Sequence, residues 1–126
     1  MSGLILHITS NDAWASAKNA GQYIAPSLAA EGFIHCSTSA QAVPVAEKFY
    51  KGQTGLILLV IDPARLNSGL KWEPPFDGAP PPGAPAADLF PHVYGPINLD
   101  AVIQILDFEV DSSGRFHLPP ELITDN

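Results

Sequence analysis

Three short segments of the sequence share one pattern, in which a residue with a side-chain hydroxyl follows a histidine two positions later. The pairs are His7 and Thr9, His35 and Ser37, and His92 and Tyr94. Residues two apart on a β-strand point to the same face, so each pair can present an imidazole together with a hydroxyl. Imidazoles donate, accept and transfer protons near neutral pH. The pattern therefore predicts one polar site at which the three segments converge.

Each histidine segment also has a purely structural interpretation. His7 lies within the apolar run 4–8, where a core histidine bonded to a backbone carbonyl would give the same sequence. Pro91 and Gly95 flank the third pair, and they either fix the chain for ligand contact or simply shape a turn. The fourth histidine, His117, is predicted to lie on the surface.

Two further segments carry candidate groups. Glu73 lies just before the proline-rich run 74–87, where its carboxylate can be a general base or a solvated group on an edge strand. Ser37 and Thr38 precede a predicted helix, so their hydroxyls and the first helical amides can hold a phosphate or cap the helix.

The single cysteine and the three histidines suggest two other chemistries. Cys36 is predicted to be a packed thiol, because adjacent strand residues face opposite sides and His35 therefore cannot activate it. His7, His35 and His92 could supply three imidazoles to zinc, as in a hydrolase. However, the sequence has neither the His-x-x-x-His nor the Cys-x-x-Cys spacing of a metal site.

The composition limits the class of protein. The chain of 126 residues has the size of one domain, 1–126, and it can bury a core without disulfides. Its formal charge is −7, which disfavours duplex nucleic acid as a partner. No apolar run approaches the ~20 residues of a membrane span, and no secretory signal is visible. With one cysteine, a reducing, cytoplasmic compartment is expected.

The order of the predicted elements indicates an α+β fold. Strands are expected at 4–9, 22–25, 33–36, 55–62, 70–73 and 102–110, with a hairpin partner at 115–118. A helix is expected from the Ser10 cap to Gly21, and a second begins at Ser37 or Thr38 and ends at Gly52. A single helical turn is expected at 27–31. Because strands outnumber helices without regular alternation, a doubly wound fold is disfavoured.

The segment 74–87 contains six prolines among fourteen residues. This composition predicts a flexible, partly polyproline loop within the domain. Such a loop can be a lid over a site. It can also dock a protein partner, which would make the chain a non-catalytic interaction module.

Four of these stretches together resemble a bacterial and plant family known as domain of unknown function 952. They are Leu-His-Ile-Thr at 6–9, Gly-Phe-Ile-His-Cys-Ser-Thr at 32–38, Trp-Glu at 72–73 and Phe-Pro-His-Val-Tyr-Gly-Pro at 90–96. The family resembles the ADP-ribosyltransferases in fold, which implies two small, mainly antiparallel sheets with about two helices. That fold clamps NAD between its sheets.

The resemblance also implies roles for individual residues. His7 would contact the NAD ribose, with Thr9 beside it. Tyr94, or else Tyr23 or Tyr50, would stack on the nicotinamide ring. Apart from the resemblance, the residues themselves suggest that Ser37 and Thr38 hold phosphate and that His92 or His35 moves a proton. Glu73, which does not clearly match the late glutamate of the transferases, is an outside candidate for stabilising a cationic transition state. The leading hypothesis is therefore a protein that binds NAD or a related small ligand, with transfer or hydrolysis at the ribosyl bond; no metal is assigned.

Overall fold

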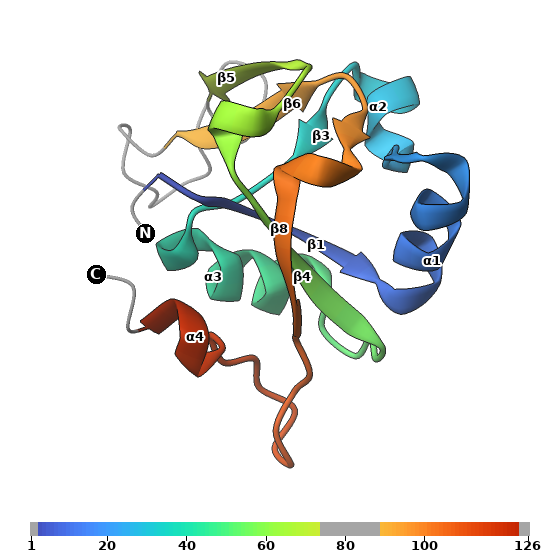
Figure 1. The fold of residues 1–126 in the computed structure, drawn as a ribbon. Coiled ribbons are helices and arrows are strands. Elements are labelled where there is room, and N and C mark those ends of the chain that lie inside the picture. The colour runs from blue at the N-terminus through green and yellow to red at the C-terminus, as the bar shows by residue number, and fades with distance from the viewer. Residues whose placement is uncertain (1–2, 74–88, 124–126) are drawn as a thin grey trace.

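The computed structural model describes residues 3–73 and 89–123 and has an α+β architecture. Figure 1 shows a central sheet crossing the molecule, a second sheet above it and helices on two sides. The central sheet consists of β1 (Ile5–Ser10), β4 (Leu56–Ile61) and β8 (Val102–Asp107). The second sheet consists of β3 (Ile34–His35), β6 (Phe90–Tyr94) and β5 (Gly69–Glu73). A third, two-stranded sheet consists of β2 (Gln22–Tyr23) and β7 (Ile97–Asn98). All strand pairs are antiparallel. The α+β class is confirmed.

The helices are α1 (Asn11–Ala20), α2 (Pro26–Glu31), α3 (Ser39–Phe49) and the short α4 (Pro120–Ile123), with 3-10 turns at Pro63–Arg65 and Leu99–Ala101. The described chain thus has three helices of more than one turn rather than the expected two, because 26–31 extends the predicted single turn. None of the helices in residues 3–73 and 89–123 combines the length and apolar character needed to cross a membrane.

The central strand β4 divides the core into two halves. All six of its residues are buried, as its unbroken apolar sequence predicts. Alternate residues face opposite sides: Ile57 and Leu59 pack with Trp14 of α1, whereas Leu58 packs with Ala42 of α3. The sheet is therefore covered on both faces, and the two layers hold it in a fixed position relative to the second sheet.

Polar caps set the bounds of both long helices. The Ser10 hydroxyl accepts a hydrogen bond from the amide of Ala13 at 3.0 Å, and α1 ends at Gly21, whose φ of 89° suits a residue without Cβ. At α3, the N-cap is Thr38, and its amide donates to the side-chain oxygen of Gln41 at 2.9 Å. The predicted caps at Ser10, Gly21 and Thr38 are confirmed.

One isolated bridge joins the first and second sheets. Leu6 of β1 and Ser37 exchange two backbone hydrogen bonds of 2.7 Å each. These bonds bring the chain beyond β3 alongside β1, so the second sheet is anchored to the first. The paired residues of β3 and β6 then place His35 directly opposite His92.

Several predicted elements differ from the structure. The strands expected at 22–25 and 102–110 end earlier, at Tyr23 and Asp107, and the strands β6 and β7 were not expected. The strand expected at 33–36 is only Ile34–His35, because Ser37 already pairs with β1. The hairpin partner expected at 115–118 is wrong: this segment is not a strand, and the Asp111 carboxylate instead accepts hydrogen bonds from the amides of Ser113 and Arg115. His117 is exposed, as predicted. The run 74–87 lies outside the described residues.

Candidate functional site

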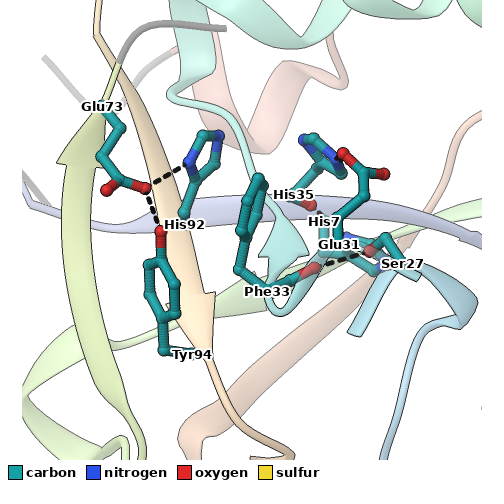
Figure 2. Close-up of polar contacts among 8 residues, drawn as sticks. All are labelled: His7, Ser27, Glu31, Phe33, His35, Glu73, His92 and Tyr94. Atoms are coloured by element: carbon teal, nitrogen blue, oxygen red, sulfur yellow. Dashed lines mark hydrogen bonds and ion pairs between the residues drawn. The ribbon is translucent and has the colours of Figure 1, made fainter. Parts of the chain in front are cut away.

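A carboxylate, an imidazole and a phenol meet on one face of the second sheet. Oε1 of Glu73 accepts hydrogen bonds from Nδ1 of His92 at 2.8 Å and from the Tyr94 hydroxyl at 2.6 Å (Figure 2). His92 and Tyr94 are two apart on β6, and Glu73 ends the neighbouring edge strand β5. The pKa of Glu73 is lowered, first by the Tyr94 hydrogen bond and then by that of His92.

His92 has one nitrogen without a partner. The side chain is almost fully buried, at 2% exposure, and Nε2 lies out of contact with solvent, with no hydrogen-bond partner among the described residues. Because Nδ1 faces a carboxylate, it carries the proton, and in the neutral ring Nε2 holds a bare lone pair. A buried polar atom left unpaired costs about 1–3 kcal/mol. This nitrogen is a candidate contact for a ligand.

Aromatic rings surround His92. Phe33 stacks on it with ring centroids 4.1 Å apart and planes 19° apart. The His35 ring lies across the edges of both, 4.8 Å from Phe33 and 5.2 Å from His92. Tyr94 lies 5.3 Å from Phe33, and Nζ of Lys71 lies 5.0 Å from the Tyr94 ring centroid. The site thus combines planar apolar surfaces with one adjacent positive charge.

A second carboxylate pairs with His35. Nε2 of His35 lies 3.2 Å from each carboxylate oxygen of Glu31, and both side chains are about half exposed. The Ser27 hydroxyl donates to the carbonyl of Phe33 at 2.8 Å and so ties the turn after α2. Figure 2 shows the two carboxylates at opposite ends of a row that contains His92, Phe33 and His35.

Glu31 and Phe33 were not predicted as site residues. Both lie in the same short stretch as His35, so the density of functional groups there was the available signal. Their role depends on the sharp turn at Gly32, whose φ is 94°, and on the pairing of β3 with β6. The glycine predicts the turn at Gly32, but the pairing of β3 with β6 cannot be derived from residue types alone.

His7 belongs to a separate, interior network, which we call the His7 network: His7, Tyr23, Thr9 and the carbonyl of His35. Nδ1 of His7 lies 2.6 Å from that carbonyl oxygen, and Nε2 lies 2.8 Å from the Tyr23 hydroxyl. The Tyr23 hydroxyl also lies 2.9 Å from Oγ1 of Thr9. Burial lowers the pKa of His7 to about 4, so the ring is neutral at pH 7.

Proton positions in the His7 network follow from its acceptors. Nδ1 faces a carbonyl and must donate, so Nε2 of the neutral ring accepts from the Tyr23 hydroxyl. That hydroxyl has only one proton, and Thr9 therefore donates its own to the Tyr23 oxygen. Both nitrogens of His7 are occupied, and a contact between His7 and a ribose would require one of these bonds to break.

Ser37 and Cys36 lie away from the carboxylate–imidazole pairs. Ser37 is buried while His35 is about half exposed, and Ser37 lies beyond the end of β3, where its backbone pairs with Leu6 of β1. Cys36 packs in the core beside Ile34, as predicted, and burial raises the pKa of its thiol. Thr38 is the N-cap of α3.

The expectation of one convergent site is therefore met by two histidine segments and not by the third. The imidazoles of His35 and His92 contact each other, whereas His7 reaches only the backbone of His35. Within residues 3–73 and 89–123, no three His, Cys, Asp or Glu side chains are grouped to hold a metal ion. The zinc trio of His7, His35 and His92 is not assembled.

The sequence of residues 8–105 matches the model of a family described as protein of unknown function (DUF952). The chain belongs to the DUF952 family. Among curated proteins, none matches it. Solved structures that resemble it are of protein CC0527 from Caulobacter crescentus. A crystal structure is 32% identical, with a TM-score of 0.79, and covers 95% of this chain and 98% of its own.

The solution structure of CC0527 gives the same result. It is 32% identical with a TM-score of 0.75, and it covers 97% of this chain and 98% of CC0527. At this identity and coverage, the likeness extends to the whole arrangement of sheets and helices. The DUF952 chain described here therefore shares its α+β architecture with an experimentally determined relative.

Proposed function

We propose that this protein binds NAD or a related nucleotide and uses His92 as a general base in transfer or hydrolysis at the ribosyl bond. The observation that carries the proposal is the buried, unpaired Nε2 of His92, on a ring that Glu73 orients through Nδ1. A carboxylate behind an imidazole fixes its tautomer and stabilises the cation that forms when it accepts a proton.

The surroundings of His92 support a ligand with a planar ring and negative charge. Tyr94 is 38% exposed and Phe33 is half buried, so both can offer ring surface to a base. Lys71 is exposed beside Tyr94 and can contact a phosphate. The small antiparallel sheets agree with the sequence resemblance to ADP-ribosyltransferases, from which NAD is inferred.

The proposed reaction needs no nucleophile from the protein. For hydrolysis, Nε2 of His92 accepts a proton from water while the water oxygen bonds to the anomeric carbon of the ribose. The bond from that carbon to nicotinamide breaks, and its electron pair leaves with the nicotinamide nitrogen. In a transfer reaction, the hydroxyl of an acceptor replaces water. Because Nε2 lies out of contact with solvent, a neighbouring side chain must move before the ligand arrives.

Titration of the histidine-labelled protein tests the proposal. We expect NAD or ADP-ribose to shift the Nε2 resonance of His92 in a long-range nitrogen–proton spectrum, while exposed His117 is unaffected. His92→Asn keeps a donor toward Glu73 but removes the base, and it should abolish release of nicotinamide. His117→Asn is the matched control and should behave as wild type. No shift at His92 with NAD, ADP-ribose or AMP at millimolar concentration would overturn the proposal.

A further inference from the structure

We propose that His35, held by Glu31, is a general acid that works together with the base His92, and that the substrate is a ribosyl compound whose leaving atom needs a proton. This inference rests on the proposed function and narrows its substrate class. Cleavage of NAD would not need the general acid His35, because nicotinamide leaves as a neutral molecule and needs no proton.

The two imidazoles have matching surroundings. Each lies at a paired position of β3 and β6, each has a carboxylate on its outer side, and their ring centroids are 5.2 Å apart. Phe33 contacts both rings, with centroid distances of 4.1 and 4.8 Å. The arrangement can therefore bring two proton-transfer groups against one small ligand.

The two imidazoles also differ in a way that separates their roles. Nε2 of His92 is buried and has no partner among the described residues. When the ring is neutral, this nitrogen carries a lone pair, so it can accept a proton but has none to donate. His35 is half exposed and can be charged from solvent, and its Nε2 proton is held by Glu31. When the His35 ring is protonated on both nitrogens, the Nε2 proton stays on the side of Glu31 and the Nδ1 proton can be donated to a substrate.

The step balances as follows. Water loses a proton to Nε2 of His92 as its oxygen bonds to the anomeric carbon. The bond from that carbon to the leaving oxygen breaks, the electron pair stays on that oxygen, and Nδ1 of His35 protonates it. The products are the free ribose hydroxyl and a neutral alcohol. His92 then returns its proton to solvent and His35 regains one, so no oxidant or other reactant is needed.

Two compounds on the same ADP-ribose scaffold test this inference. NAD releases a leaving group that needs no proton, whereas the 1-O-methyl riboside of ADP-ribose must be protonated as it breaks. We expect His35→Gln to lower kcat/KM for the methyl riboside about 100-fold or more, and to lower it for NAD by a factor at least about 10 times smaller. His92→Asn should lower both. Glu31→Gln, which keeps an acceptor but loses the charge, should lower the methyl riboside reaction about 10-fold only.

The pattern of losses decides between outcomes. Equal losses of both reactions in His35→Gln, or no loss in either, would overturn the general acid and leave the proposed function standing. If wild-type protein cleaves and binds neither compound, the proposed function fails and this inference fails with it. The pH profile gives a second readout: the fall of the methyl riboside rate at high pH should disappear in His35→Gln.

Discussion

His7 and His92 are both buried imidazoles, yet their hydrogen bonding differs in one respect. Both nitrogens of His7 have partners inside the protein, a carbonyl and a tyrosine hydroxyl. His92 has one partner, Glu73, and a second nitrogen with none in the described part of the chain. A saturated histidine contributes to stability, whereas an unsaturated one is kept at a cost in stability, which is a reason to look for a ligand.

The comparison also bears on the role that the sequence resemblance to ADP-ribosyltransferases implies for His7. That resemblance places the histidine of the first strand, His7, on the ribose. In this structure both nitrogens of His7 are hydrogen-bonded inside the protein, and the unpaired nitrogen lies on His92 of the second sheet. The substitutions below measure whether the two histidines have the separate roles that their contacts indicate.

The largest effect is expected for replacement of His7 by leucine. The change leaves the carbonyl of His35 without its side-chain donor and the hydroxyl of Tyr23 with Thr9 as its remaining partner, and a buried group that loses a partner costs about 1–3 kcal/mol. We therefore expect unfolding in urea to show a loss of about 4 kcal/mol. His92→Leu should lose about 1 kcal/mol, because its one partner, Glu73, can be hydrated. Equal losses in the two variants would contradict the distinction.

The second prediction concerns acid. The pKa of His7 is about 4 in the folded protein against 6.5 for the unperturbed group, because burial disfavours the cation. Between these values the unfolded state binds more protons, so the free energy of unfolding falls as the pH falls from 6.5 to 4. The expected loss is about 3 kcal/mol, at about 1.4 kcal/mol per pKa unit.

Denaturant midpoints measured from pH 7 to pH 4 test this loss. His7→Leu removes the titrating group and should show a much flatter dependence over this window. Glu73 and Asp111 have lowered pKa values, so their contributions are lost below the unfolded pKa of a carboxyl group, at more acidic pH. A wild-type slope that survives unchanged in His7→Leu would show that another group is responsible.

The sequence predicted well what depends on neighbouring residues. Ser10 and Gly21 bound α1, and Thr38 begins α3, because capping depends on side chains within a few positions. His92 and Tyr94 were expected on an irregular, proline-flanked segment, whereas both lie on β6, two positions apart. For His35 and Ser37, the strand ends between the two residues, and Ser37 pairs with Leu6 of β1 instead.

The contacts that the sequence did not reveal join distant segments. His7 and His35 are 28 positions apart, and Glu73 and His92 are 19 apart. Their meeting depends on the pairing of β1 with Ser37 and of β5 with β6, which residue types do not specify. Tyr23 was a candidate to stack on a ligand, and its hydroxyl instead completes the His7 network. These long-range contacts are needed to distinguish His7, which has both nitrogens hydrogen-bonded, from His92, which has one nitrogen unpaired.

The smallest effects are expected from removing one hydroxyl in each region. Tyr23→Phe leaves Nε2 of His7 without a donor in the interior and should cost about 1–2 kcal/mol in urea unfolding. Tyr94→Phe removes a bond from an exposed phenol to a carboxylate that keeps His92, so its cost should stay below about 0.5 kcal/mol. The same variant should raise the pKa of Glu73, because the Tyr94 hydrogen bond is the main cause of its lowering. If Tyr94→Phe proved the more destabilising of the two, the contacts of Tyr94 and His92 with Glu73 would stabilise the fold as the His7 network does. The case for a ligand site at His92 would then be lost.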